Sequence, residues 1–438
     1  MSSSASESSP TSALPAQTYD DALKAALEVA GWPSSLVCAS KRPTILPDLA
    51  ALVETLLYRS HVDEVFVLPN GVDLLGHADA LPEELVRAAR APSVRTFLEE
   101  LSEETMQTWR GRVYCSSADM RDERELKEHD GRPLDRLLDK ARALPAAHPE
   151  GGVYIGEIRK AEKYRHALDN RWVKTVLRRD VKDYLGRERS EGMPYWDRFD
   201  EGVFCGGRFG GSPLHVDQVS WSNVGKSFCG SKLLAIWPQG EASRTMFDEH
   251  NYQLFVPPLA ESEARALEGA CRVALLQPRD VVIFSGGNAH MALSISSELS
   301  LTAYESFIGL DPANLRLFLQ SGTAAQYRQC RARTAMMEDI KLEVAENIAD
   351  LIADIDGGHV EDPDLKRHLP AALAVLQSDE YMARQLKRLT TAPPPAKQPR
   401  LDKAVEPTPP QSGPASPSPS AAATAAVPTP SPPSSSTP

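Results

Sequence analysis

The sequence predicts an α+β fold in which a β-rich core, built as a sandwich or a barrel, lies between two mainly helical regions. Residues 151–310 contain many short β-rich runs bounded by Gly and Pro. Residues 18–150 and 311–390 instead place apolar side chains mostly at helical spacing. The two ends, residues 1–17 and 391–438, are rich in Ser, Ala and Pro. We expect both ends to be disordered, because such segments bury too little apolar surface to offset the entropy of ordering.

The N-terminal region is predicted to contribute helices and a short β segment. Residues 20–29 carry apolar side chains at helical spacing, and Gly31 is suited to ending this helix. Residues 62–75 predict a short strand and a turn at Asn70-Gly71, either alone or followed by a second strand. Helical spacing recurs in three further segments: 48–57, 82–110 and 133–144.

The core region is predicted from short apolar and β-branched runs separated by turn residues. The runs are 151–158, 202–211, 232–238, 252–258, 272–278, 280–287 and 298–310. Helical spacing returns after residue 311 and is clearest in the segment ENIADLIADI, residues 346–355.

The composition narrows the class of protein. Hydrophobic residues make up 42% and charged residues 25% of the 438 residues, which is typical of a globular protein with a core. The chain has 48 basic and 60 acidic residues, which gives a net charge of -12. Binding of nucleic acid through a basic surface is therefore disfavoured. The six cysteines are scattered without a Cys-x-x-Cys pair, which argues against a disulfide scaffold or structural zinc module and fits a reducing compartment.

Targeting features are weak. The first 17 residues lack the basic and apolar segments of a signal peptide, and no uncharged apolar run approaches the ~18 residues of a membrane span. A basic patch from Lys397 to Lys403 is somewhat like a short nuclear import signal, although a solubilising tail explains it equally well. We therefore expect a nuclear or cytoplasmic protein that is not secreted and not in a membrane.

The segment GSPLHVDQVSWSNVG contains the candidate metal ligands. In a strand, residues i and i+2 point to the same face, so His215 and Asp217 can present an imidazole and a carboxylate to one metal ion. A second histidine from a neighbouring strand would complete a 2-His-1-carboxylate face with open positions. That face suits non-heme Fe(II) and oxygen chemistry.

The His-x-acid pattern alone is weak, because five of the ten histidines have an acidic residue two positions later. Only His215 follows a Gly-rich strand and precedes a strand with an inward-facing lysine candidate. We interpret the other pairs as surface histidines near surface acids: His61/Asp63, His77/Asp79, His148/Glu150 and His359/Glu361. The acidic cluster Asp248, Glu249 and His250 is interpreted as a solvated loop.

Lys232 opens the run KLLAIWP, in which Lys232, Leu234 and Ile236 share one face. A lysine on the inner face of a β-rich core is costly unless an anion pairs with it. The side chain therefore either pairs with a ligand carboxylate inside the core or is solvated at the strand end. Lys226 is a rival for the same role, but its neighbours suggest a loop.

Taken in order, these motifs resemble the core of a JmjC-domain (cupin-like) Fe(II)/2-oxoglutarate oxygenase, over roughly residues 150–310. The matching motifs are His215-x-Asp217, Ser212 three residues before the histidine, Asn223 nine residues before the lysine, Gly230-Ser231-Lys232, and His290 at the end of QPRDVVIFSGGNAH. The resemblance implies a double-stranded β-helix (jelly-roll or cupin) core with flanking helices.

The resemblance also implies the roles of these residues. His215, Asp217 and His290 would hold Fe(II). Lys232, with Ser212, would bind the far carboxylate of 2-oxoglutarate, and Asn223 would line the cosubstrate site. With O2, such enzymes hydroxylate a substrate, or demethylate an N-methyl group, and release succinate and CO2.

Two departures from the family pattern stand out. The spacing from Asp217 to Asn223 is longer than in asparaginyl-hydroxylase-like members. Residues 285–289, SGGNA, replace the usual Pro and aromatic residues before the distal histidine and predict a small, flexible pocket wall. The role of Tyr304, on the following strand, is left open.

The family includes protein hydroxylases, histone demethylases and RNA hydroxylases. A single core with flanking helices favours a protein or peptide substrate, and the acidic balance makes nucleic acid less favoured. The helices after residue 311 resemble the region through which hydroxylase-type members dimerise, or simply pack against the core. The alternative function is a catalytically inactive cupin-like binding or scaffold protein.

Overall fold

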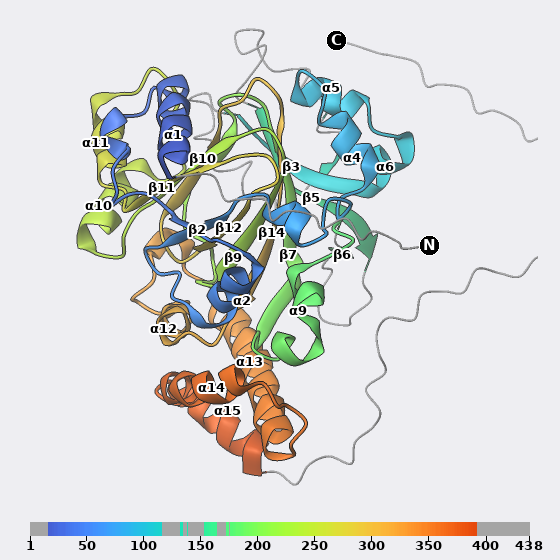
Figure 1. Ribbon diagram of the computed structural model, residues 1–438, viewed down its shortest axis with the longest axis vertical. Coiled ribbons are helices and arrows are strands. Elements are labelled where there is room, and N and C mark those ends of the chain that lie inside the picture. The colour runs from blue at the N-terminus through green and yellow to red at the C-terminus, as the bar shows by residue number, and fades with distance from the viewer. Residues whose placement is uncertain are drawn as a thin grey trace, which may run out of the picture. The chain divides into compact units, whose positions relative to one another are not determined.

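The structure of the protein, a computed structural model, describes residues 16–115, 132–134, 138, 153–163, 172–174 and 176–391. They belong to one compact unit that extends to Ala392. The described residues form an α+β fold with two sheets, so the predicted fold class is confirmed at that level (Figure 1). Most of the predicted helix 133–144, His148, the tail with its basic patch and the first 15 residues lie outside the described residues.

The N-terminal region contains helices interrupted by short strands. Helix α1 (Ala16–Ala30) ends at Gly31, whose φ of +64° is a left-handed conformation that glycine adopts without strain. The segment 62–75 forms β2 (Val65–Leu68) and then α3 (Gly71–Leu74), so the alternative with a second strand is wrong. The other elements are η1 (Ser34–Leu36), β1 (Thr44–Ile45), α2 (Leu49–Tyr58), α4 (Glu83–Ala88), α5 (Val94–Glu99), α6 (Glu103–Thr108) and β3 (Trp109–Cys115).

Ten described strands form a large sheet in the order β1-β2-β12-β9-β14-β7-β5-β3-β4, with β6 beside β5. The small sheet has the order β11-β10-β13-β8. No ladder joins the two sheets among the described strands, so no barrel is closed. The remaining strands are β4 (Arg132–Pro133), β5 (Val153–Lys163), β6 (Trp172–Lys174), β7 (Tyr195–Gly206), β8 (Gly211–His215), β9 (Ser222–Cys229), β10 (Lys232–Ile236), β11 (Arg272–Leu276), β12 (Val281–Ser285), β13 (His290–Ser294) and β14 (Ser300–Ile308).

Alternating side chains on the strands divide the apolar core into layers. Between the two sheets, Leu234 and Ile236 of β10 share one cluster with Val282 and Phe284 of β12. The outer face of the large sheet packs against α2, α4 and α5. The outer face of the small sheet packs against α1, α10 (Glu241–His250) and α11 (Glu261–Glu268), which lie together beside it in Figure 1. A polar side chain that points between the sheets is thus surrounded by apolar ones.

Two stretches of the core differ from the sequence prediction. Residues 252–258 form no strand, because Pro257 and Pro258 have no N–H to donate to a ladder. Phe255 nevertheless lies fully buried against the outer face of the small sheet, which explains the apolar composition of this stretch. Residues 222–229 form the central strand β9 although their sequence is largely polar.

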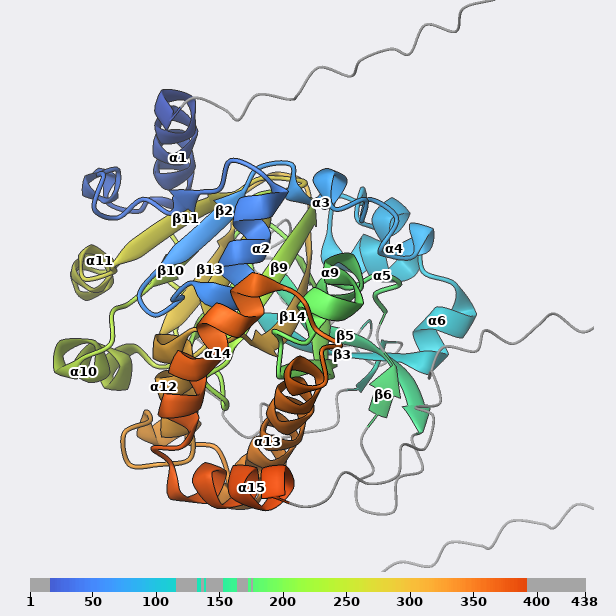
Figure 2. The same ribbon diagram turned by 60° about the horizontal axis from the view of Figure 1, so that its bottom comes forward.

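The C-terminal helices pack onto the end of the core that carries β7 and β14 (Figure 2). Their apolar faces share a cluster with Val219, Trp221 and Ile308 of the core. The elements are α12 (Pro312–Gln320), η3 (Arg328–Cys330), α13 (Thr334–Asp356), α14 (Pro363–Leu376) and α15 (Glu380–Thr391). Within the described part of the chain, no helix has both the length and the apolar character needed to cross a membrane.

Candidate metal centre

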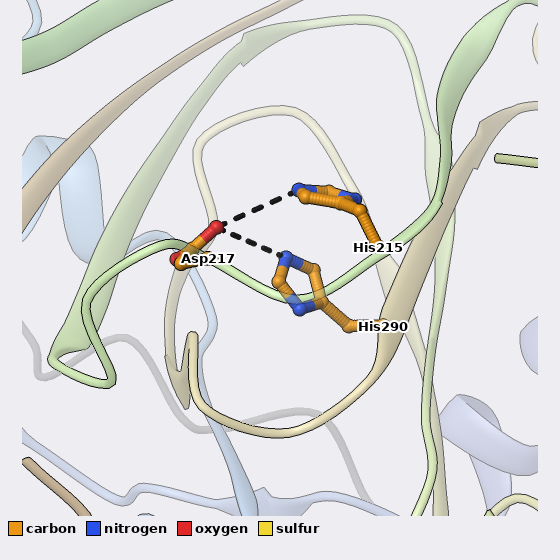
Figure 3. Close-up of side chains that lie close together, drawn as sticks. All are labelled: His215, Asp217 and His290. Atoms are coloured by element: carbon orange, nitrogen blue, oxygen red, sulfur yellow. Dashed lines mark ion pairs between the residues drawn. The ribbon is translucent and has the colours of Figure 1, made fainter. Parts of the chain in front are cut away.

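His215, Asp217 and His290 point toward one another at one end of the space between the sheets (Figure 3). His215 ends β8 and His290 begins β13, and the two residues are paired in the ladder between these strands. Asp217 Oδ1 lies 3.6 Å from His215 Nε2 and 3.9 Å from His290 Nε2. Among the described residues, these three side chains form the group of imidazoles and carboxylates that could hold a metal ion, with ligand atoms within 4.8 Å of one another.

Both imidazoles are held in the form that can bind a metal through Nε2. Nδ1 of His215 lies 2.7 Å from the carbonyl oxygen of Pro213, and Nδ1 of His290 lies 2.9 Å from that of Asn288. A carbonyl can only accept, so each Nδ1 carries the proton and donates it. In the neutral imidazole the lone pair is then on Nε2, and both Nε2 atoms face Asp217.

Electrostatics keep His290 neutral. The pKa of His290 is lowered to about 4, mainly by burial and also by the neighbouring His215, while Asp217 acts in the opposite direction. The neutral imidazole is the form that a divalent metal requires. The site therefore presents a neutral distal histidine at any pH above about 5.

Asp217 is oriented by hydrogen bonds to its second oxygen. Nδ2 of Asn223 donates to Oδ2 of Asp217 at 2.7 Å, and Oδ1 of Asn223 accepts from the Ser306 hydroxyl at 2.9 Å. The Ser306 contact fixes which end of the amide faces Asp217, so Oδ1 of Asp217 stays available for a metal. The structure thus places Asn223, predicted to line the cosubstrate site, against the metal-ligand carboxylate.

The segment 285–289 is small because Asp217 fills the space beside it. A Cβ on Gly286 would lie 1.9 Å from Oδ2 of Asp217, and the Gly286 carbonyl accepts from the Asp217 amide at 2.9 Å. Asn288 is fully buried, donating to the Trp237 carbonyl at 2.8 Å and to Asp63 at 2.5 Å. The five residues are all buried and anchored on both sides, in contrast to the flexible wall that the sequence predicts.

Lys232 lies deeper between the sheets, as the inward-facing alternative predicts. Its side chain is 1% exposed, and its Nζ has no hydrogen-bond partner among the described residues. Burial lowers the pKa of Lys232 to about 7. Its Nζ lies 5.2 Å from the ring centre of Tyr154, and the Tyr154 hydroxyl is 3.0 Å from the hydroxyl of Ser212. A buried lysine over the ring of Tyr154, whose hydroxyl meets that of Ser212, is suited to a carboxylate ligand.

A row of aromatic rings connects the lysine end of this space with the metal end. Tyr154 stacks on Phe204 at 5.8 Å between ring centres, and Phe204 meets Tyr304 edge-on at 5.3 Å. Tyr304 lies 6.1 Å from Phe284, which in turn lies 5.1 Å from His290. Tyr304, whose role the sequence leaves open, is therefore part of this inner wall, and Gly225 opposite it leaves room for its ring.

Lys226 is not a rival for the inner role. Its neighbours form β9, so the predicted loop is wrong, and strand alternation places Lys226 on the face opposite to Asn223. There, with no exposed surface, it forms an ion pair with Glu305 of β14. Glu305 also accepts from the Val181 amide at 2.9 Å, at the start of α9 (Val181–Ser190).

Two interpretations of the remaining histidines are wrong. His61 and His77 are buried at 0% and 3% exposure, and His61 bonds to Ser222 and to the Thr55 carbonyl. Asp63, interpreted as a surface acid, anchors the segment before His290 through Asn288. The predicted loop at Asp248, Glu249 and His250 is the last turn of α10, where His250 is buried and bonds to Gln253.

Sequence reasoning missed Tyr154, Ser306 and Gly286. The Gly286-Gly287 pair just before His290 was the available signal, because adjacent glycines often mark a close approach of the backbone. Tyr154 and Ser306 come from strands β5 and β14, far from Ser212 and Asn223 in the chain. The ladder between β9 and β14 pairs Ser306 with Asn223, whereas the packing of the two sheets brings Tyr154 to Ser212.

The close approach at Gly286 yields a prediction. We expect Gly286→Ala to weaken Mn(II) binding by about 10-fold or more, because the added methyl group must displace the Asp217 carboxylate. Electron paramagnetic resonance titration of free Mn(II) measures this. Gly309→Ala is the control, since its Cβ would clash with the Leu56 carbonyl, away from the triad. Equal Mn(II) affinity in wild type and Gly286→Ala would contradict the prediction.

In comparisons with known proteins, no family model matches the chain and no curated protein matches its sequence. A function for these residues therefore has to be inferred from the chemistry of the site itself.

Proposed function

We propose that the protein is an Fe(II)- and 2-oxoglutarate-dependent dioxygenase that hydroxylates, or N-demethylates, a protein substrate. The observation that carries this proposal is Lys232, a buried lysine whose Nζ has no hydrogen-bond partner among the described residues and which shares the space between the sheets with the His215, Asp217 and His290 triad. A triad alone fits many metals and reactions. A triad combined with a buried cation fits a small acid that binds the metal at one end and the lysine at the other.

The donor set suits Fe(II) among the common metals. Two imidazoles and one carboxylate leave positions open on a six-coordinate ion, which suits Fe(II). Catalytic zinc uses the same three ligands, so the choice of Fe(II) depends on the acid-binding role proposed for Lys232. When bound, Fe(II) would supply the oxygen chemistry, in which 2-oxoglutarate and O2 yield succinate, CO2 and one oxygen atom inserted into the substrate.

The chain's own residues would bind and orient the metal and the cosubstrate. His215, Asp217 and His290 would hold the metal, and Lys232 with the hydroxyl groups of Ser212 and Tyr154 would hold the far carboxylate of the cosubstrate. The aromatic wall between them would exclude water from the reacting atoms. Asn223 would act on the metal through Asp217, in addition to any contact with the cosubstrate.

The order of the strands supports a double-stranded β-helix. Along the chain, strands β7 to β14 belong to the large, small, large, small, small, large, small and large sheet in turn. Such alternation is what winding two antiparallel strands together into a jelly roll produces. We propose that these eight strands form the core of that kind.

Charge bears on the substrate, and the packing of the C-terminal helices bears on the oligomeric state. The net charge of -12 argues against a nucleic acid and leaves a protein or peptide as the proposed substrate. Because α12 and α13 cover the core within one chain, a homodimer through the C-terminal helices stays a prediction that sedimentation equilibrium tests.

An anaerobic titration of Fe(II) into protein with 2-oxoglutarate tests the proposal without knowledge of the substrate. We expect a visible charge-transfer band from a 2-oxo acid bound to Fe(II), and on adding air a slow release of succinate. A folded, iron-loaded sample without the band would contradict the proposal and favour the inactive binding or scaffold protein. With a substrate in hand, a mass gain of one oxygen atom without formaldehyde would identify hydroxylation.

A further inference from the structure

The loop that follows Asp217 is held from outside the β core by the segment between α12 and α13. The loop runs from Asp217 to Trp221, and the segment covers residues 321–332. The amide of Ser220 donates to the Ser321 hydroxyl at 2.8 Å. Val219 is completely buried in the cluster formed by the C-terminal helices. The backbone that carries a metal ligand is thus packed against a separate part of the fold.

Gln326 makes the central contacts between the two segments. Its side chain is 5% exposed, and its Nε2 donates to the carbonyl oxygen of Gln218 at 2.7 Å and lies 3.4 Å from that of Asp217. A further contact of Nε2, at 3.2 Å, goes to the carbonyl of Cys330. The NH2 group of Gln326 therefore holds the backbone of the loop at Asp217 and also the backbone of the segment to which Gln326 belongs.

The other end of the same amide fixes its orientation. Oε1 of Gln326 accepts from the amide of Gly322 at 2.7 Å and from the amide of Ala332 at 3.0 Å. Because two N–H groups face Oε1, the amide cannot flip, and its NH2 group must face the loop after Asp217. No other residue type supplies two donors and two acceptor sites at this length.

From these contacts we infer that Gln326 is a positioning residue for the metal centre, through which the C-terminal segment fixes the backbone of Asp217. The inference rests on the proposed function, because it concerns the same metal site. Asp217 is held on its carboxylate by Asn223 and on its backbone by Gly286 and Gln326. Loss of the Gln326 contacts frees the loop on one side, and the carboxylate then loses its alignment with the two histidines.

The test compares Gln326→Met with Gln329→Met. Methionine matches the length of glutamine and removes its hydrogen bonds without adding a charge. Gln329 lies in the same segment and is exposed, and its side-chain amide donates to the Asp248 side chain. We expect Gln326→Met to weaken binding of Mn(II) alone by about 10-fold, and Gln329→Met to bind as wild type.

A second pair of measurements separates positioning from general stability. Leu376→Ala truncates a fully buried residue of α14 in the C-terminal cluster and does not alter the loop contacts, so it should lower the melting temperature without changing Mn(II) affinity. Amide hydrogen exchange of the metal-free protein should be faster for residues 217–221 in Gln326→Met and unchanged there in Leu376→Ala.

The outcomes are distinct. If wild type binds no Mn(II) at the triad, the proposed function fails and the inference falls with it. If wild type binds Mn(II) and Gln326→Met binds it equally well, only the positioning role is overturned. Weakening by Leu376→Ala as large as that by Gln326→Met would also overturn it, because the effect would then be one of stability.

Discussion

Replacement of His215 by alanine should abolish the binding of a divalent metal, with an affinity loss of more than about 100-fold. Loss of a residue that merely supports a ligand already costs about 10- to 100-fold, and His215 would supply one of the three ligand atoms itself. Asp217→Ala should have an effect of the same size. Isothermal titration of Mn(II), or of Fe(II) without oxygen, measures it, and the visible band with 2-oxoglutarate should vanish in both variants.

A matched control comes from the exposed pair His359/Glu361. His359 has an acid at the same spacing as His215 but lies exposed after α13, away from the triad. We expect His359→Ala to bind metal as wild type. The bound metal should also raise the melting temperature of wild type and of His359→Ala, because a ligand at about 100 times its dissociation constant stabilises the folded state by about 2.7 kcal/mol. Metal-dependent stabilisation of His215→Ala would contradict the assignment.

The sequence predicted the residues of the site better than the elements around them. Strand alternation, a local rule, predicts that His215 and Asp217 point to the same side, and in the structure they face each other, although Asp217 lies in the loop after β8. The inner position of Lys232 follows from the same rule, since Leu234 and Ile236 lie on its face in the structure. Such inferences need only a strand and its period.

The wrong predictions concern tertiary contacts, which local sequence patterns do not reveal. The sequence of β9 suggests a loop because it is largely polar. In the structure, its inward-facing residues contact Asp217 and Tyr304 instead of packing into an apolar core. The buried ion pair of Lys226 and Glu305 is hidden because each residue alone is typical of a surface. Asn288, Gly286 and Gln326 gain their roles through tertiary packing, and only their positions in the fold show what they support.

Replacement of Lys232 by methionine should weaken 2-oxoglutarate binding by about 100-fold while leaving metal binding intact. Removing one partner of a buried charge pair costs at least about 2–5 kcal/mol, and Lys232 is the cation at that end of the site. Metal affinity should stay unchanged because Lys232 is not among the triad's ligand atoms. The dependence of the visible band on 2-oxoglutarate concentration measures the loss, and an unchanged half-saturation would refute the role.

The same substitution should stabilise the protein without ligands, which distinguishes Lys232 from an ordinary buried lysine. Within the part of the chain that the structure describes, Nζ of Lys232 has no hydrogen-bond partner, and burial lowers its pKa from 10.5 to about 7. Between these values the unfolded chain holds more protons than the folded one, so this lysine makes stability rise with pH from about 7 to about 10.5. At pH 7 the unpaired charge costs on the order of 4 kcal/mol.

Lys226→Met is the control with the opposite sign. It leaves Glu305 buried without its cation, so the free energy of unfolding should fall by about 3–5 kcal/mol while 2-oxoglutarate affinity is retained in the folded protein. Denaturant unfolding of both variants at pH 7 and pH 9.5 checks the pair. Lys232→Met should exceed wild type in stability at pH 7, and the difference should shrink at pH 9.5. A buried lysine that lowers the free energy of unfolding of the ligand-free protein, and that is needed only when an acid binds, belongs to a binding site and not to the scaffold.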